Sequence, residues 1–300
     1  MRFAITGSSG LIGSALRHAL AAAGHSVTRV VRSLAGIRPG ERAVVWHPAE
    51  GAIEAAGLED HDIVINLAGE SLAGVWTAAK KRRIRESRVR ATTLIAETVA
   101  GLRSPPGVLI SASGFNYYGD RDPSAVVTEA SPPGAGFLPE VVVEWEASTR
   151  AAEQAGIRVV HTRFGTVLSP DGGLLQVLLP LFRLGLGAKF GGGEQPWPWI
   201  ALPEIPPAML HVIQSTGIAG PVNFVAPEAV TNEQFTKSLA AVVGRPAPFA
   251  LPAFAARLAP GRMADEMLLG GARVVPEKLL ASGYSFRYPQ LEQALRAILR

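Results

Sequence analysis

The 300-residue sequence contains no cysteine. It therefore has no disulfide framework, no thiolate nucleophile and no zinc–thiolate site. It also lacks an apolar run of the about 18 residues that a membrane span requires. The best candidate for such an apolar run is Leu174–Phe182, which is too short to span a membrane and contains Pro180. The first residues, MRFAITGSSG, do not have the pattern of a secretory signal peptide. We expect a cytoplasmic protein with no membrane partner.

Charged residues are also sparse, at 18%, against 48% apolar residues. This composition excludes a disordered chain and allows a large buried core. The net charge of +4 suits an anionic small molecule but is too small to indicate nucleic acid by itself. The histidines are scattered, and no His/Asp/Glu cluster has the spacing of metal ligands. We expect a small-molecule substrate, no metal and no nucleic-acid partner. A homodimer is the assembly to consider, although nothing in the sequence determines the oligomeric state.

The first 165 residues contain an alternation of strand and helix patterns. Short apolar or β-branched runs bounded by glycine predict strands, and longer runs with helical spacing predict helices between them. The expected strands are Arg2–Thr6, Ser26–Val31, Asp62–Leu67, Val108–Ser111 and Ile157–Arg163, and the expected helices are Leu11–Ala23, Trp76–Leu102 and Pro139–Ala155. This order predicts an α/β fold with a doubly wound parallel Rossmann sheet.

The remainder of the chain has a different pattern, because proline and glycine interrupt its helical stretches. We interpret residues 1–168 as a nucleotide-binding Rossmann domain with a return segment at about 221–245. Residues 169–300 then form a smaller substrate lid over the carboxyl ends of the strands.

The strongest local motif is the turn TGSSGLIG at residues 6–13, which follows the first strand and opens the first helix. In a dinucleotide-binding turn, the first glycine permits the tight bend, the second allows close approach of a diphosphate, and the third allows close helix packing. N–H groups at the helix start attract the phosphates. The alternative is a glycine-rich turn without a ligand. The residues expected to bind the dinucleotide here are Gly7, Ser9, Gly10, Leu11, Ile12 and Gly13.

The end of the second strand indicates which dinucleotide binds. An Asp or Glu at this position typically holds the ribose hydroxyls of NAD. Here Arg32 follows the strand, nineteen positions after Gly13, with no acid nearby. A guanidinium suits a phosphate dianion, so we expect NADP as the cofactor. The alternative is a solvated arginine at a strand end.

Three segments resemble the extended, atypical short-chain dehydrogenases: the TGSSGLIG turn, NLAGES (66–71) and ISASGFNYYGD (110–120). Later segments, among them RFGTVLSPDGGLL (163–175) and GPVNFVAPEAVTNEQFTKSLA (220–240), are similar to the epimerase-like family that carries a C-terminal domain of unknown function. The resemblance runs from about Met1 to Leu299. It implies an NADP site that also includes an arginine of the long helix and the backbone of Leu67, Ala68 and Gly69.

Helical spacing identifies that arginine as Arg88. It recurs with Ile84, Thr92 and Ile95 on one inward stripe, and an inward arginine needs an anionic partner. We interpret the other basic residues of this helix as a solvated face. Nucleic-acid binding is a weaker alternative, because no stacking aromatics are interleaved. These residues are Lys80, Lys81, Arg82, Arg83, Arg85 and Arg90.

The resemblance implies a Ser or Thr after the fifth strand and a Tyr-x-x-x-Lys pair on the next helix, whose tyrosine acts as acid and base. Ser113 matches the serine position, although a turn-capping serine is the alternative. The Tyr-x-x-x-Lys pair is missing, because no tyrosine has a lysine four residues on. The helix segment LPEVVVEWEASTR contains neither residue type, and its acids Glu144 and Glu146 fit solvated, structural or catalytic roles.

Tyr117 and Tyr118 are the phenols that remain near the expected nicotinamide. We expect one to donate a proton and the other to pack in the core, and the sequence leaves open which. In the lid, Trp197 and Trp199 either stack on a substrate ring or pack internally. Related proteins commonly continue Trp-Ile-His-x-x-Asp at this point, but Ala201 replaces the histidine here. A role that depends on that histidine is therefore in doubt.

Two functions follow from these patterns. The first is an NADP-binding oxidoreductase or epimerase-like enzyme that acts on a small carbonyl or sugar-like substrate. The retained Ser113 and the two tyrosines favour it. The second is a non-catalytic NADP-binding sensor or scaffold, which the missing Tyr-x-x-x-Lys pair favours.

Overall fold

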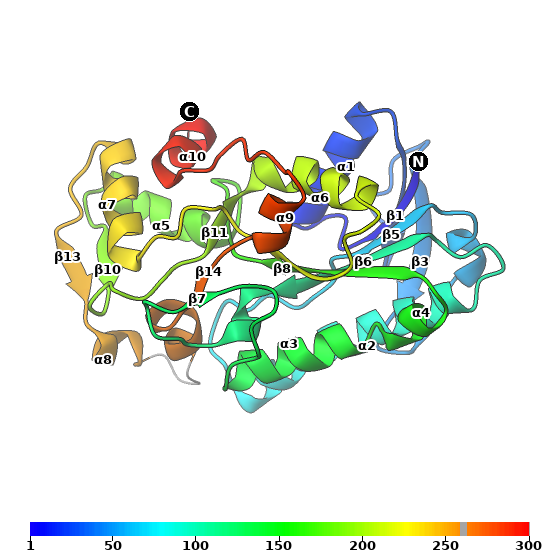
Figure 1. Ribbon diagram of the computed structural model, residues 1–300, viewed down its shortest axis with the longest axis horizontal. Helices are drawn as coiled ribbons and strands as arrows, with labels where there is room; N and C mark the ends of the chain where they lie inside the picture. The colour runs from blue at the N-terminus through cyan, green and yellow to red at the C-terminus, as the bar shows by residue number, and fades with distance from the viewer. Residues whose placement is uncertain (259–262, 300) are drawn as a thin grey trace.

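A computed structural model describes residues 1–258 and 263–299. Its centre is an eight-stranded sheet in the order β12-β8-β6-β5-β1-β2-β3-β4 (Figure 1). All neighbouring strands are parallel except β3 and β4. The predicted doubly wound parallel sheet is therefore confirmed. The strands are β1 (Arg2–Thr6), β2 (Ser26–Val31), β3 (Arg42–His47), β4 (Ala52–Ile53), β5 (Ile63–Asn66), β6 (Val108–Gly114), β8 (Arg158–Phe164) and β12 (Gly220–Phe224).

Helices cover both faces of this sheet (Figure 1). One face packs against α1 (Leu11–Ala22) and α6 (Ile205–Gln214). The opposite face packs against α2 (Ala78–Ala100) and α4 (Arg150–Gln154), and α3 (Phe137–Ala147) lies beside them on this side of the sheet. Within the described residues, none of the helices has both the length and the apolar character needed to cross a bilayer.

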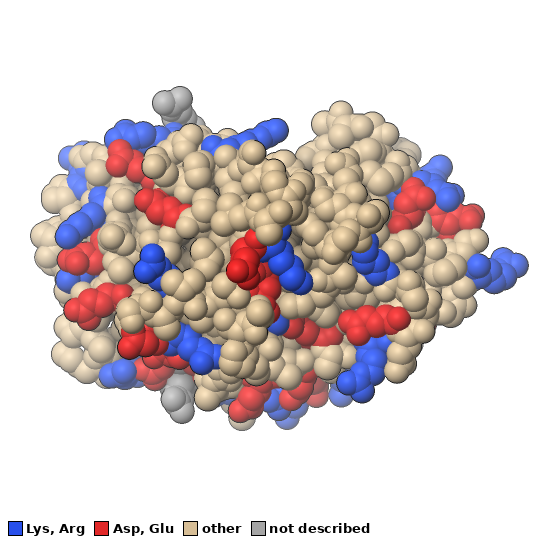
Figure 2. All heavy atoms as spheres, viewed as in Figure 1, with Lys and Arg blue, Asp and Glu red and all other residues tan. Residues whose placement is uncertain are grey.

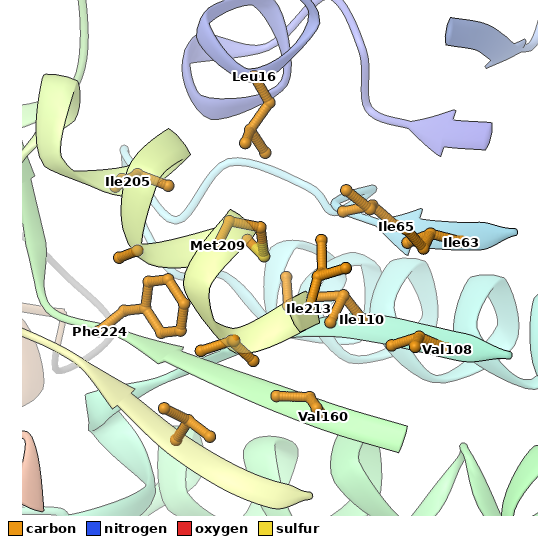
Figure 3. Close-up of a cluster of buried hydrophobic side chains, with 14 of the residues drawn as sticks. Leu16, Ile63, Ile65, Val108, Ile110, Val160, Ile205, Met209, Ile213 and Phe224 are labelled. Carbon is orange, nitrogen blue, oxygen red and sulfur yellow. The ribbon is translucent and has the colours of Figure 1, made fainter. Parts of the chain in front are cut away.

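Strand β1 shows why both faces need cover. Phe3 and Ile5 belong to the core under α1 and α6, together with Leu16 and Met209 (Figure 3), whereas Ala4 belongs to the opposite core. Successive side chains of a strand point to opposite faces, so a strand buried on both faces has a continuous apolar run instead of an alternation. This is why the short run FAI could be recognised as a strand.

The expected helix Pro139–Ala155 is divided in two. The Ser148 hydroxyl donates a hydrogen bond to the Glu144 carbonyl at 2.7 Å, and the Thr149 hydroxyl donates to the Glu146 carbonyl at 2.8 Å. Such bonds from side chain to backbone compete with helix continuation. Helix α3 therefore ends at Ala147 and α4 begins at Arg150.

A second core lies beyond the carboxyl ends of the strands. It is formed by α5 (Gly173–Arg183), α7 (Asn232–Val243) and α10 (Leu291–Ile298) around Trp197 and Trp199. Both tryptophans are at most 5% exposed, so they pack inside this region instead of facing a substrate.

The remaining elements are short. Three strand pairs lie outside the main sheet: β7 (Val126–Val127) with β14 (Arg273–Val274), β9 (Thr166–Leu168) with β11 (Trp199–Ala201), and β10 (Ala188–Phe190) with β13 (Phe249–Leu251). The short helical elements are η1 (Ala55–Leu58), η2 (Phe115–Tyr118), η3 (Leu202–Glu204), α8 (Ala253–Ala256), η4 (Asp265–Leu269) and α9 (Glu277–Ala281).

The two-domain division, with its boundary at 168 and its return segment at 221–245, stays a prediction. Within the return segment, β12 lies in the main sheet, whereas α7 packs in the second core. Helix α6, which falls within 169–300, packs on the sheet.

The strand order also locates a crevice for a ligand. The chain builds outward from β1 through β2 to β4 and then returns to the other side of β1 with β5. In open α/β sheets, ligands bind at the carboxyl ends of the strands where the order reverses. Here that point lies between β1 and β5.

Candidate functional site

The glycine turn after β1 is closed at its first and third glycines. A Cβ atom on Gly7, where φ is +63°, would lie 2.8 Å from the Leu67 carbonyl carbon and oxygen. A Cβ atom on Gly13 would lie 2.2 Å from the Gly7 carbonyl oxygen. Neither contact is sterically possible, so only glycine lets β1, β5 and α1 converge at this point.

The same turn is less confined at Gly10, the N-cap residue of α1. The nearest atom to a Cβ placed there is the Gly7 carbonyl oxygen, at 3.3 Å, and both Ser9 and Gly10 are exposed. The first N–H groups of a helix have no partner within it, and here Leu11 and Ile12 supply them. The turn therefore has the geometry that a diphosphate requires.

The end of β5 is attached to this turn through Thr6. The N–H groups of Leu67 and Ala68 donate to Thr6 Oγ1 at 3.0 and 3.2 Å. Thr6 Oγ1 in turn donates to Asn66 Oδ1 at 2.6 Å, and Asn66 Nδ2 donates to Thr92 Oγ1 of α2 at 2.8 Å. The two amides predicted at the cofactor site thus bind a side chain of the protein, and they hold the β5 end in a defined position. The sequence signal for this network was the polar residue at the end of each of two apolar strands, Thr6 in β1 and Asn66 in β5.

Arg88 lies beside Gly69, as helical spacing predicts. A Cβ atom on Gly69 would be 3.5 Å from the guanidinium carbon. The guanidinium donates to the backbone carbonyls of Glu70 and Ile84 at 3.0 and 3.1 Å, and it lies 5.1 Å from the Trp145 ring centroid. Burial lowers the pKa of Arg88 to about 10, so the group stays charged at neutral pH. Among the described residues, no carboxylate forms an ion pair with it, which leaves its charge available to an anionic ligand.

The other basic side chains of α2 are mostly matched by acids. On the face in Figure 2, basic and acidic residues are likewise interspersed over the surface. This arrangement supports a solvated helix face rather than a nucleic-acid surface. The pairs are Lys80–Glu70 (2.8 Å), Arg83–Glu70 (3.7 Å), Arg85 with Glu140 and Glu144 (both 3.3 Å) and Arg90–Glu86 (3.4 Å).

Several arginines lie on the β2 side of the turn, and most of them contact Glu41. Glu41 accepts from both Arg17 and Arg29 at 3.0 Å, and a backbone N–H bond from Arg38, together with Arg29 and Arg17, holds the pKa of Glu41 below its ordinary value. Arg32 is exposed directly after β2 and has no ion pair among the described residues. Arg32 is thus the arginine of this group that can take a further phosphate.

Ser113, at the end of β6, is hydrogen-bonded to a buried ion pair. Its hydroxyl donates to Glu146 Oε1 at 2.6 Å. Arg163 of β8 donates to both oxygens of the same carboxylate, from Nε at 2.8 Å and from Nη2 at 2.7 Å. Burial alone would lower the pKa of Arg163, but the bonds to Glu146 raise it above its ordinary value. Glu146 is therefore both the acceptor of the Ser113 hydrogen bond and the partner of a buried guanidinium.

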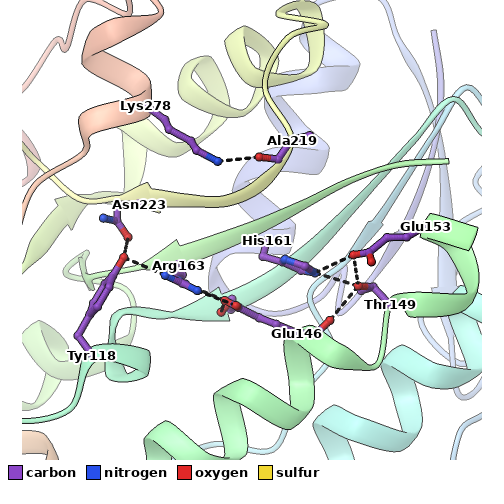
Figure 4. Close-up of polar contacts among 10 residues, drawn as sticks. Tyr118, Glu146, Thr149, Glu153, His161, Arg163, Ala219, Asn223 and Lys278 are labelled. Carbon is purple, nitrogen blue, oxygen red and sulfur yellow. Dashed lines mark hydrogen bonds and ion pairs between the residues drawn. The ribbon is translucent and has the colours of Figure 1, made fainter. Parts of the chain in front are cut away.

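The two adjacent tyrosines have different surroundings. Tyr118 is 0% exposed; it accepts from Arg163 Nη1 at 3.0 Å and donates to Asn223 Oδ1 at 2.7 Å (Figure 4). Burial raises the pKa of Tyr118. Tyr117 is only half-buried, and its ring centroid lies 3.5 Å from the Arg163 guanidinium carbon. Tyr118 is thus the tyrosine that packs in the core, and Tyr117 is the more accessible phenol.

Sequence reasoning missed the pairing of Glu146 with Arg163. The signal was Arg163 itself, because a charged side chain in the apolar strand RVVHTRF requires a partner. Ser113 uses its hydrogen on Glu146, so its lone pairs remain to accept a hydrogen bond from a ligand. This arrangement can receive a proton from a substrate hydroxyl.

A cavity of about 420 Å³ opens at the loop that follows β6, and Ser113, Tyr117, Tyr118 and Glu146 are not among the residues that line it. One wall includes residues of η2 and of the start of α3, and the other includes Arg257, Asp265, Glu266 and Leu269. Glu266 of this second wall accepts the N–H groups of Phe137 at 3.2 Å and Leu138 at 2.7 Å, so it caps α3. No cluster of three His, Asp or Glu side chains suited to a metal occurs in the described part of the chain.

The parallel sheet, the glycine turn at its first strand and the second core beyond the carboxyl ends of the strands define an extended Rossmann protein of the short-chain dehydrogenase type. The family model described as "NAD dependent epimerase/dehydratase family" matches residues 3–224, and "Domain of unknown function (DUF1731)" matches residues 251–298. The chain belongs to the epimerase/dehydratase family, and the resemblance drawn from its motifs is confirmed.

Several relatives match nearly the whole chain. Epimerase family protein Mb2239 of Mycobacterium bovis is 42% identical over 97% of this chain and 95% of its own. The crystal structure of human epimerase family protein SDR39U1 with NADPH is 34% identical, with a TM-score of 0.90 over 99% of both chains. A structure described as the nucleoside-diphosphate sugar epimerase from Corynebacterium glutamicum is 35% identical, with a TM-score of 0.81; it covers 100% of this chain and 58% of that one.

Proposed function

We propose that this protein is an NADP-dependent oxidoreductase or epimerase-like enzyme that acts on a small carbonyl or sugar-like substrate. The observation that carries the proposal is the glycine turn, in which Gly7 and Gly13 are sterically closed and Gly10 is exposed at the start of α1. In dinucleotide-binding turns this second glycine is the position where the diphosphate approaches the backbone. The NADPH in the human relative's structure supports the choice of cofactor.

The cofactor would be held by groups at three strand ends. The N–H groups at the start of α1 would bind the diphosphate, and the exposed Arg32 would bind the additional phosphate. Arg88 would supply positive charge beside β5, because it forms no ion pair with a carboxylate among the described residues. When bound, the nicotinamide would exchange a hydride with the substrate carbon.

Proton transfer would use Ser113 and Glu146 in place of the missing Tyr-x-x-x-Lys pair. A substrate hydroxyl would give its proton to Ser113 Oγ while the Ser113 proton passes to Glu146 Oε1, 2.6 Å away. The reverse transfers would accompany carbonyl reduction. The Tyr118 hydroxyl donates to Asn223 and accepts from Arg163, and burial raises its pKa, so it is poorly suited to this role. Tyr117 remains a second proton donor to be tested.

A panel of carbonyl compounds with optically followed NADPH oxidation tests this proposal. In Glu146→Gln we expect turnover to fall by about a hundredfold or more, as for loss of a general acid–base group, with an unchanged NADPH dissociation constant. Glu144→Gln is the matched control, because that exposed acid of the same helix pairs with Arg85. Equal turnover of Glu146→Gln and wild type would refute the Ser113–Glu146 role. Full turnover of both Tyr117→Phe and Tyr118→Phe would exclude a phenol as proton donor.

The second candidate is a non-catalytic NADP-binding sensor or scaffold. The observation that favours it is the double hydrogen bond from Arg163 to Glu146, which neutralises the proposed proton acceptor. A protein of this kind would bind NADPH with the same dependence on Gly10 and Arg32. It would oxidise none of the bound NADPH across the carbonyl panel, and this separates it from the enzyme.

A further inference from the structure

A cluster of arginines lies beside the glycine turn, on the face of β2 that packs against α1. Arg29 shares this face with Val27, and its Nε donates to the hydroxyl of Ser8, a buried residue of the turn, at 3.2 Å. Arg17 extends from the second turn of α1, the helix whose first N–H groups are assigned to the diphosphate. Arg32 follows three positions after Arg29. These guanidinium groups therefore belong to the surroundings of the cofactor phosphates.

Glu41 is the carboxylate that joins two of these arginines. It directly precedes β3, and its oxygens accept from Arg17 Nη1 and Arg29 Nη1, both at 3.0 Å. Its Oε2 also accepts the Arg38 N–H at 3.1 Å, so the same carboxylate fixes the loop that follows Arg32. The three side chains of this bridge are only 13–24% exposed. Their mutual attraction is therefore screened less than that of a surface pair.

A carboxylate and a phosphate compete for the same guanidinium groups, because both accept the paired N–H donors of arginine. The Glu41 carboxylate offsets part of the charge of Arg17 and Arg29 and uses some of their donors. Arg32 is exposed and forms no ion pair within the part of the chain that the structure describes. A negative charge in this cluster also repels an incoming phosphate dianion. The loop between β2 and β3 thus carries a group that acts against the additional phosphate of NADP.

We propose that Glu41 is a specificity-determining residue of the cofactor site, which limits how strongly the ribose phosphate of NADPH is held. It occupies Arg17 and Arg29 and leaves Arg32 to meet that phosphate. NADH should respond less to Glu41, because it lacks the phosphate and its charge of about −2. Net carbonyl reduction leaves oxidised NADP behind in each turnover, and a limited hold on the phosphate favours its release. The inference rests on the NADP site of the proposed function.

The test compares the full chain with Glu41→Gln in fluorescence titrations of NADPH and NADH. We expect Glu41→Gln to bind NADPH about fivefold more tightly and NADH within about twofold of wild type, because one negative charge is removed. The fragments 2′,5′-ADP and 5′-AMP, titrated by calorimetry, should separate in the same way, since they differ only in the additional phosphate. Raising the salt from about 0.05 M to about 0.5 M should reduce the gain to less than about twofold.

Three further variants control for other effects. Glu50→Gln removes the same charge from an exposed turn between β3 and β4, and it should change neither cofactor's affinity. Glu41→Asp keeps the carboxylate, so its ratio of NADPH to NADH affinity should stay within about twofold of wild type. Adding Arg17→Gln to Glu41→Gln should cancel most of the gain, because it removes one of the released cations. A purely structural role of Glu41 predicts instead that Glu41→Gln weakens all four ligands together.

The inference is overturned if Glu41→Gln gains no more affinity for NADPH than for NADH, if it binds both less tightly, or if its gain is the same at high salt. Absence of binding by every ligand would refute the cofactor site and this inference together. Binding of NADPH without oxidation across the carbonyl panel would refute the enzyme and leave the role of Glu41 intact. The two failures are therefore distinguishable.

Discussion

Gly13→Ala should damage the fold as well as the cofactor site. The added methyl group would lie 2.2 Å from the Gly7 carbonyl oxygen and 2.9 Å from the Ser8 Cα atom. Both are backbone atoms, so α1 must move away from the turn by about 1 Å before the contact is tolerable. Overpacking of this kind costs about 1–3 kcal/mol. With an unfolding entropy of about 2.1 cal/mol/K per residue, a chain of this length should lose about 2–5 °C in Tm.

Gly10→Val separates the two effects. Gly10 is exposed, and a Cβ there makes one close contact, 3.3 Å from the Gly7 carbonyl oxygen, which a shift of a few tenths of an ångström relieves. The substitution should therefore leave Tm within about 2 °C of wild type, because a poor N-cap residue costs about 1 kcal/mol. NADPH affinity should fall by a hundredfold or more, since roughly two charge-assisted hydrogen bonds to the diphosphate are lost.

The assays are differential scanning calorimetry and NADPH titration by fluorescence. Gly217→Ala is the control, because Gly217 has no positive φ and a Cβ there has nothing within 4 Å. It should change neither quantity. The reasoning is refuted if Gly13→Ala is as stable as Gly217→Ala, or if Gly10→Val still binds NADPH with wild-type affinity.

Three further predictions concern single side chains. Arg32→Asp should weaken NADPH binding and shift preference toward NADH in parallel titrations; equal affinity of the wild type for both would contradict the assignment. Tyr118→Phe should lower the free energy of unfolding in urea by about 1–3 kcal/mol, because Arg163 Nη1 loses a buried partner, and a change below about 0.5 kcal/mol would count against this. His161 is buried and bonded to Thr149 (Figure 4), and burial lowers its pKa from the ordinary 6.5. At low pH the unfolded chain then binds protons at this histidine more readily than the folded protein does. The free energy of unfolding should therefore fall as the pH drops below 6.5. His161→Gln should reduce this pH dependence, as measured by urea titrations at several pH values.

Much of the cofactor half could be predicted because its signals are local. The turn at 6–13 lies within one strand–helix unit, and β1 and β2 begin and end at the predicted residues. The family resemblance implied an arginine of the long helix, and helical periodicity identified it as Arg88, since its neighbours on the stripe reveal the buried face. Strands β3 and β4 were not predicted; they are at the edge of the sheet, where β4 has only two residues.

The catalytic half could not be predicted, because its contacts join distant residues. The Glu146–Arg163 pair spans a helix end and a strand, and neither residue has a local pattern that names the other. Which of Tyr117 and Tyr118 is buried depends on Asn223, a hundred positions further along the chain. The bond between Ser113 and Glu146 likewise requires the packing of α3 onto β6. Periodicity describes one element at a time and contains none of this information.

The cap on α3 has a consequence for biosynthesis. The first amides of this helix are satisfied by Glu266, which is 128 positions closer to the C-terminus than Leu138. A ribosome therefore releases the nucleotide turn and most of the sheet long before α3 can be completed. A nascent chain that already folds around its dinucleotide would still have an open helix end, and this end would wait until the segment around Glu266 has been synthesised.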